Sequence, residues 1–167
     1  PANAQYQKGE ARYFGGQYAE ASADYIAVVE NYPDSETSLR AAALYSAGWS
    51  SEKLGDFDKA LELYSQVAES FSRSDQAPLC LLRIGRVNTE QQRYEAAVEA
   101  YQTVAANYSG TSHAADANYG LGILYKQQGR MDDAVAAFSQ VGRDAREIYV
   151  ASLIEAANIH ITEGRAE

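Results

Sequence analysis

The residues that most readily bind metals or exchange protons are few in this chain. His113 and His160 lie 47 residues apart, and neither has a second His or Cys nearby at ligand spacing. A zinc site needs three or four such ligands, so these two histidines do not predict one. Asp132 and Asp133 open an expected helix, where carboxylates favour the positive end of the helix dipole. That position explains the pair without a role in acid–base catalysis.

The nucleophile and loop signatures of enzymes are also missing from the sequence. Cys80 is the only cysteine, so no disulfide can form within the chain. Its neighbours, "PLCLLRIG", predict a small buried apolar residue rather than a reactive thiol. The glycines are isolated and form neither a phosphate-binding loop nor a nucleophile elbow. We therefore expect no catalytic site, no metal and no cofactor.

Charge and hydropathy narrow the range of partners. The chain has 14 Lys and Arg against 23 Asp and Glu, a net charge of −9, and no basic run with interleaved aromatic residues. Such a surface repels phosphates, which disfavours nucleic acid as a partner. No apolar run approaches the ~20 residues that a membrane-spanning helix needs. The remaining class of partner is a protein or a peptide.

A motif of about eighteen residues recurs four times in the chain. The copies begin at Gly15, Leu54, Gln91 and Gln128, and the second reads "LGDFDKALELYSQVAESF". The shared columns are an aromatic or Met (Tyr18, Phe57, Tyr94, Met131), an alanine (Ala21, Ala60, Ala97, Ala134), an aromatic (Tyr25, Tyr64, Tyr101, Phe138) and a valine (Val28, Val67, Val104, Val141). The alanines are 39, 37 and 37 residues apart, a period typical of repeat proteins.

The spacing inside each copy predicts an amphipathic helix. The columns are offset by three, four and three residues, which places them on one helical face, whereas a strand would alternate every second residue. Helix-like segments such as "HAADANYGLGILYKQQ" precede the copies, so the unit is a helical hairpin. A glycine recurs in these preceding helices, at Gly9, Gly48, Gly85 and Gly122. Because glycine is unfavourable inside a helix, we expect two helix backbones to approach closely there.

This pattern resembles the tetratricopeptide repeat (TPR). In the second copy the matching residues are Gly48, Gly55, Phe57, Ala60 and Tyr64. The resemblance implies an all-α fold, an α-α superhelix of four helical hairpins followed by one C-terminal helix. The expected repeats are residues 2–33, 38–72, 76–109 and 113–143, with the last helix at 146–163, in a single domain of residues 1–167.

The repeats differ from the commonest TPR form in two respects. Valine follows the second aromatic where alanine is more usual, and the period exceeds the usual ~34 residues. The extra length lies before the first helix of each hairpin, in "NYPDSETS", "SFSRSDQA" and "NYSGTSHA". This ending resembles repeats of bacterial cell-envelope proteins, such as the TolA-binding protein and the outer-membrane assembly lipoproteins. It favours a periplasmic or envelope-associated location, while common turn chemistry leaves a cytoplasmic one open.

The C-terminal segment, "EIYVASLIEAANIHITEGRAE", reads as the first helix of a fifth hairpin with Gly164 at its turn. Terminal repeats normally have a polar outer face. This helix instead keeps Leu153, Ile154 and Ile161. We expect either a chain cut from a longer protein or a helix that caps the stack, and the unfinished end offers a contact for a homo-oligomer.

In the TPR frame, certain positions of the first helix of each hairpin face a concave groove. They include Glu10 and Phe14 and are unusually aromatic towards the N-terminus. Aromatic and Arg side chains are enriched at interface hot spots. The alternative is that Tyr45 and Trp49 only fill the gap between neighbouring helices. The predicted partner-binding residues are Tyr6, Tyr13, Tyr45, Trp49, Lys53, Arg86, Tyr119 and Lys126.

The resemblance also allows a test for the clamp with which chaperone adaptors of this family hold a C-terminal carboxylate. The equivalent positions carry Tyr6, Glu10, Ser46, Leu79 and Arg83, of which only Arg83 fits. We expect no binding of an acidic C-terminal peptide. The favoured function is a non-catalytic scaffold that binds a peptide or partner helix. A self-assembling structural subunit and an accessory domain of a larger envelope enzyme are the alternatives.

Overall fold

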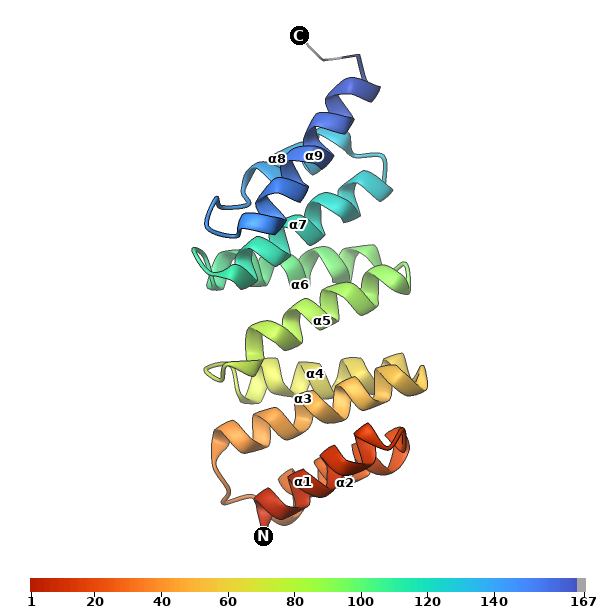
Figure 1. Ribbon diagram of the computed structural model, residues 1–167, viewed down its shortest axis with the longest axis vertical. Helices are drawn as coiled ribbons and strands as arrows, with labels where there is room; N and C mark the ends of the chain where they lie inside the picture. The colour runs from red at the N-terminus through yellow and green to blue at the C-terminus, as the bar shows by residue number, and fades with distance from the viewer. Residues whose placement is uncertain (165–167) are drawn as a thin grey trace. The chain divides into compact units, whose positions relative to one another are not determined.

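The computed structural model describes residues 1–164, and this part of the chain is all α-helical (Figure 1). The helices form hairpins in chain order, as the 3-4-3 spacing predicts. Their bounds are α1 (Ala2–Phe14), α2 (Tyr18–Asn31), α3 (Thr37–Leu54), α4 (Phe57–Ser70), α5 (Gln76–Glu90), α6 (Tyr94–Asn107), α7 (Ser112–Gln127), α8 (Met131–Ser139) and α9 (Arg146–Thr162).

The chain forms two compact units. Unit 1 is Pro1–Ile84 and unit 2 is Gly85–Glu167, so the boundary falls within α5. Unit 1 holds the hairpins α1–α2 and α3–α4 with the first part of α5, and unit 2 holds the end of α5, the helices α6 to α8, and α9. The assignment of residues 1–167 to a single domain stays a prediction.

A left-handed residue turns the chain between the two helices of each hairpin. Gly16, Gly55 and Gly129 have φ angles of 77°, 77° and 74°, a region that glycine enters without steric cost. Gln92 takes the same place in the third hairpin with a φ of 58°. In the second hairpin the turn continues into Asp56, whose carboxylate accepts a hydrogen bond from the backbone N–H of Lys59 and caps α4. The turn chemistry of the sequence therefore sets the helix ends.

Each glycine of the predicted column leaves space for the aromatic ring found sixteen residues later. A Cβ added to Gly9 would lie 2.8 Å from the ring of Tyr25, and one added to Gly48 would lie 2.5 Å from that of Tyr64. The same contact joins Gly85 to Tyr101 and Gly122 to Phe138. The close approach predicted for the glycines is present, but it brings a helix against an aromatic side chain rather than against another backbone.

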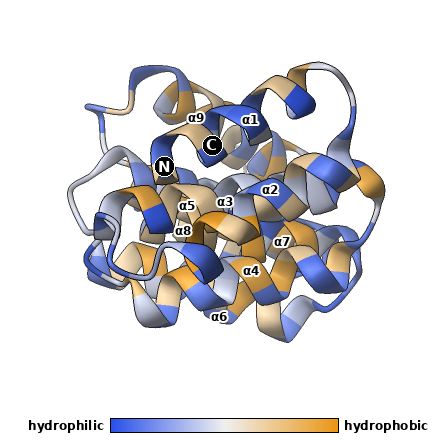
Figure 2. Ribbon diagram, turned by 90° about the horizontal axis from the view of Figure 1, so that it is seen from below, coloured by the Kyte–Doolittle hydropathy of each residue, from blue (hydrophilic) through white to orange (hydrophobic). Residues whose placement is uncertain are grey.

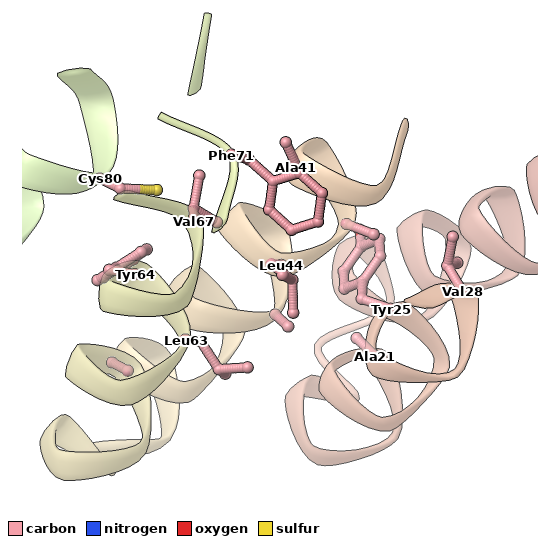
Figure 3. Close-up of a cluster of buried hydrophobic side chains, with 13 residues drawn as sticks. Ala21, Tyr25, Val28, Ala41, Leu44, Leu63, Tyr64, Val67, Phe71 and Cys80 are labelled. Atoms are coloured by element: carbon pink, nitrogen blue, oxygen red, sulfur yellow. The ribbon is translucent and has the colours of Figure 1, made fainter. Parts of the chain in front are cut away.

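The core of unit 1 is built from the repeated columns (Figure 3). Ala21, Val28, Ala60 and Val67 are fully buried on the faces of α2 and α4 that meet α3. Between them lie small residues and Leu44 of α3, and Cys80 of α5 joins the same cluster. Figure 2 shows hydrophobic and hydrophilic residues along the same helices, as expected of amphipathic elements.

A buried carboxylate links the first two helices of unit 1. Asp24 of α2 is 5% exposed and pairs with two cations of α1, at 2.9 Å from Lys8 Nζ and 2.7 Å from Arg12 Nη1. Gln5 donates a further hydrogen bond to the Asp24 carboxylate, at 2.9 Å. A buried charge needs such partners. Lys8 and Arg12 are therefore already occupied within unit 1.

Unit 2 repeats the hairpin design, but the second helix of its last hairpin, α8, is shorter than the other helices. Ala97, Val104, Ala134 and Phe138 are buried, as the columns predict. However, α8 ends at Ser139, so Val141, predicted to lie on the same helix, lies in the connection that follows. It is still buried. The following residues include Gly142, which does not favour a longer helix.

The last helix of unit 2, α9, packs against α7 and α8 through one side only. Ile159 and Ser152 are buried, whereas Val150, Leu153, Ile154 and Ile161 are exposed. The exposed residues are spaced three, one and seven apart and form one apolar stripe along the helix. Gly164, with a φ of 68°, has the left-handed conformation of the other hairpin turns. The exposed side of α9 therefore lacks the polar character that the outer face of a terminal repeat normally has.

Candidate functional site

Aromatic side chains of α1 and α3 gather around a hollow in unit 1. The end of α1 supplies Tyr13 and Phe14, and the middle of α3 supplies Tyr45 and Trp49, one helical turn apart. The hollow has a volume of about 240 Å³. We call it the aromatic pocket, and it is lined by Glu10, Tyr13, Phe14, Tyr25, Tyr45, Ser46 and Trp49.

The pocket rings are held by the helices behind them. Tyr45 contacts Trp49 edge-on, with ring centroids 6.0 Å apart, and also packs against the buried ring of Tyr64, at 5.9 Å. Tyr13 has edge contacts with Phe14 at 5.7 Å and with Tyr18 at 5.3 Å. Such contacts add to the gain from burial alone. The tyrosines and Trp49 are therefore positioned before any partner arrives.

Phe14 differs from the other rings of the pocket because it is 83% exposed. It stands at the end of α1, where only Tyr13 among the rings contacts it. Tyr13, Tyr45 and Trp49 are only partly exposed, and Tyr25 is buried. The pocket thus has a buried floor, half-buried walls and one exposed ring on its rim.

Arg83 of α5 covers one face of the Trp49 indole. Its guanidinium carbon lies 3.6 Å from the ring centroid, a cation–π contact. Its Nη1 lies 3.4 Å from Glu52 Oε2, and the two side chains are 16% and 11% exposed. Because Arg83 stacks on Trp49 and pairs with Glu52, its positive charge is balanced within unit 1.

The tyrosine hydroxyls of the pocket stay neutral at physiological pH. Burial raises the pKa of Tyr13, and the nearby charge of Arg83 opposes this without reversing it. Burial likewise raises the pKa of Tyr45, against the lowering effect of Arg83, and it raises the pKa of Tyr25. The hydroxyls can therefore donate or accept hydrogen bonds, and Glu10 is the one acidic residue in the pocket lining.

The structure brings together three of the five predicted site residues of unit 1. Tyr13, Tyr45 and Trp49 share the pocket. Tyr6 lies behind it, with its ring 5.2 Å from that of Tyr25 and its hydroxyl 3.2 Å from Ser46 Oγ. Lys53 is exposed in the last turn of α3 and does not line the pocket. The same rings pack between helices and reach the surface, so their role in partner binding stays a prediction.

The three predicted site residues of unit 2 each have a separate neighbour. Arg86 is half-exposed and lies 3.6 Å from Glu90 on the same helix. The ring of Tyr119 packs at 5.7 Å from that of the buried Phe138. Lys126 Nζ pairs at 2.6 Å with Glu155 of α9. The lysine is thus neutralised within unit 2 by the helix that follows the last hairpin.

Two residues at the candidate site, Phe14 and Arg83, were not among the binding residues predicted from the sequence. Phe14 stood among the groove positions but not among the chosen binding residues, although an exposed ring beside a tyrosine was a usable signal. Arg83 was considered only as a carboxylate clamp. Its stacking on Trp49 joins α5 to α3, a contact that residue spacing alone does not predict. Arg83, the one residue that matches the carboxylate clamp of the chaperone adaptors, contacts Trp49 and Glu52.

Two larger hollows lie at connections between hairpins. One, of about 470 Å³, lies between residues 70–76 and the start of α3 in unit 1, and the other, of about 370 Å³, lies near residues 109–115 and 140–145 in unit 2. Hydroxyl, amide and small side chains make up most of both linings. Neither gathers aromatic side chains as the pocket of unit 1 does.

Metal and membrane chemistry can be assessed over residues 1–164. Within this range, no group of three or more His, Cys, Asp and Glu side chains could hold a metal ion. None of the helices in the same range is long and apolar enough to cross a membrane. Cys80 is fully buried, and burial raises the pKa of its thiol to about 12. This confirms its prediction as a small core residue.

Comparisons with known proteins agree on the fold. The sequence model described as Tetratricopeptide repeat matches residues 6–78 and 82–148. A sequence search of the curated proteins found no significant match.

Three solved structures illustrate the likeness. MamA from Desulfovibrio magneticus RS-1 is 16% identical, with a TM-score of 0.74 over 98% of this chain and 86% of its own. BtubC from P. vanneervenii is 14% identical, with a TM-score of 0.76 over 94% and 70% of the two chains. The TPR-like repeats of a putative kinesin light chain from Podospora anserina are 20% identical, with a TM-score of 0.70 over 98% and 87%. These likenesses confirm the all-α repeat fold predicted from the sequence.

Proposed function

Because the chain belongs to the tetratricopeptide repeat family, whose members commonly mediate protein–protein interaction, we propose that it is a non-catalytic scaffold that holds a partner protein at the aromatic pocket of unit 1. The partner contributes a peptide or a helix that lies across α1 and α3. Of the residues expected from the sequence, Tyr13, Tyr45 and Trp49 contact it, and Phe14 joins them.

The observation that carries this proposal is the exposed ring of Phe14 beside a ready-formed pocket. A phenyl ring that is 83% exposed leaves most of its apolar surface in water. Tyr13, Tyr45 and Trp49 are already fixed by their neighbours, so a partner would order few side chains on binding. Rigid aromatic side chains around a pocket are typical of interface hot spots.

The test compares two truncations of exposed apolar residues in the same unit. Peptides are selected from a random phage-displayed library with the wild-type protein, and their affinities are then measured for Phe14→Ala and for Leu54→Ala. Leu54 is 51% exposed and lies at the end of α3, outside the pocket lining. We expect Phe14→Ala to weaken the selected peptides at least tenfold and Leu54→Ala to leave them unchanged. Equal affinities for all three proteins would refute the assignment of the site.

Self-assembly through α9 is the second candidate function. Val150, Leu153, Ile154 and Ile161 expose an apolar stripe, and a second copy of the chain could cover it. Light scattering across a range of protein concentrations tests this directly. A dimer that Ile154→Glu converts to a monomer would support it. A monomer at every concentration would exclude self-assembly by this stripe.

The setting that we propose is a bacterial envelope complex, either as an independent scaffold or as an accessory domain of a larger envelope enzyme. The support is the "NYPDS" ending of the first hairpin, which resembles repeats of envelope proteins. Fractionation of the native cells, followed by immunodetection, would locate the protein. Its recovery in the cytosolic fraction alone would rule out this setting.

A further inference from the structure

We propose that the aromatic pocket recognises a positively charged side chain, arginine or lysine, of the partner. The inference rests on the proposed function, since it names the chemistry of the group that the same pocket receives. It depends on the charge of Glu10, on the rings that surround the hollow, and on Arg83, which already binds to an aromatic ring and a carboxylate in unit 1.

Glu10 gives the pocket a negative charge that is not balanced by an ion pair. Over residues 1–164, no basic side chain pairs with Glu10. The nearest cations along α1, Lys8 and Arg12, are bound to Asp24, and Arg83 is bound to Glu52. The whole chain carries a net charge of −9, which further favours the approach of a cation.

The rings of the pocket suit a cation as well as an apolar group. Tyr13, Tyr45 and Trp49 present π systems, whose negative faces attract ammonium and guanidinium groups. Lys and Arg also carry an apolar stem, which can lie along rings such as the exposed Phe14 while the charged end enters. An anionic side chain would meet Glu10, whose charge would repel it.

Arg83 shows that this combination of groups holds a guanidinium. It stacks 3.6 Å from the centre of Trp49 while its Nη1 lies 3.4 Å from Glu52. The pocket offers a second arrangement of the same kind, with aromatic rings and one carboxylate, Glu10, with which no cation of residues 1–164 pairs. The partner's basic side chain would complete it.

The experiment uses three short peptides that differ in one side chain. The peptides are acetyl-Gly-X-Gly-amide, in which X is arginine, citrulline or norleucine. Citrulline keeps the shape of arginine without the charge, and norleucine supplies an apolar chain. Trp49 is the only tryptophan, so its single indole N–H resonance in an NMR spectrum reports on the pocket. We expect a saturable shift with the arginine peptide and at least tenfold weaker binding of the citrulline peptide.

Matched charge variants identify the carboxylate. Glu10→Gln should weaken the arginine peptide at least fivefold and reduce the effect of added salt on its affinity. Glu30→Gln, an exposed position on α2 outside the pocket, should change neither property. Equal affinity for arginine and citrulline peptides, or an unchanged affinity in Glu10→Gln, would overturn the proposal.

The remaining outcomes separate this inference from the proposed function. If the norleucine peptide binds and the arginine peptide does not, the pocket is a docking site for an apolar side chain and the cation proposal is wrong. If none of the three shifts the Trp49 resonance, the cation proposal also fails. The Phe14→Ala comparison with library-selected peptides still decides independently whether the pocket is the partner-binding site.

Discussion

Replacing Gly48 by alanine should destabilise unit 1, although alanine is the better helix former. The added Cβ would lie 2.5, 2.8 and 3.0 Å from three atoms of the Tyr64 ring. Ordinary carbon contacts are about 3.5 to 4.0 Å. The ring is fully buried and packs against Tyr45, so it cannot move aside without displacing other core residues.

The expected loss is the difference between two opposing effects. Overfilling a well-packed core costs about 1–3 kcal/mol, and three crowded atoms on a fixed ring favour the upper end of that range. The higher helix propensity of alanine returns about 1 kcal/mol. We therefore expect Gly48→Ala to lower the free energy of unfolding by about 2 kcal/mol.

Urea denaturation followed by Trp49 fluorescence measures this loss, because Trp49 lies in the same unit as Gly48. Gly142→Ala is the control, since a Cβ there meets no atom within 4 Å. Because Gly142 lies in unit 2, its denaturation is followed by circular dichroism, and its stability should change by less than about 0.5 kcal/mol. Tyr64→Leu should make room for the new methyl group, so the double variant should be more stable than the sum of the two losses predicts. A Gly48→Ala protein as stable as the wild type would refute the glycine–aromatic contact.

Three further predictions concern a buried column of the repeats, a hairpin turn and the buried thiol. Ala97→Leu should lower the free energy of unfolding by about 1–3 kcal/mol because Ala97 is fully buried. Urea denaturation monitored by circular dichroism measures this, and an unchanged midpoint would contradict the close packing of the alanine column. Gln92→Gly should raise stability by about 0.5 kcal/mol in the same assay, because it removes left-handed strain at the turn, and a loss would show that the Gln92 side chain stabilises it. At pH 8, iodoacetamide should modify Cys80 at least about a hundredfold more slowly in the native protein than in urea, because a thiol with a pKa of about 12 forms little thiolate at that pH. Equal rates of modification would place the thiol at the surface.

The sequence predicted the hairpins closely because their determinants are local. The expected last helix, residues 146–163, compares with α9 at Arg146–Thr162, and the glycines at the turns marked the helix ends. The fourth hairpin was placed less well, since its repeat was expected to run to residue 143 and α8 ends at Ser139. The valine column suggested a continuous helix there. A buried side chain such as Val141 can occupy the same space from a loop, which the residue pattern does not distinguish.

The candidate site was predicted only in part because it depends on contacts between hairpins. Tyr13, Tyr45 and Trp49 were identified from their type and their place in the helices, and the structure groups them around one hollow. The contacts of Arg83 with Trp49 and of Lys126 with Glu155 join residues about thirty positions apart. Spacing within one repeat carries no information on such pairs. The type of a residue therefore indicated where a site could lie, but not which charges were already neutralised.

The fit between a glycine and an aromatic ring also fixes how the two helices of a hairpin align. If one helix slid along the other by a residue, the ring of Tyr64 would leave the gap at Gly48 and meet a side chain. Alignment is therefore set inside the hairpin, and the segments that join one hairpin to the next are free to vary. They do vary in this chain, from residues 108–111 to residues 140–145. Loop length can thus change over evolutionary time, by insertion or deletion, without disturbing the packing within each hairpin.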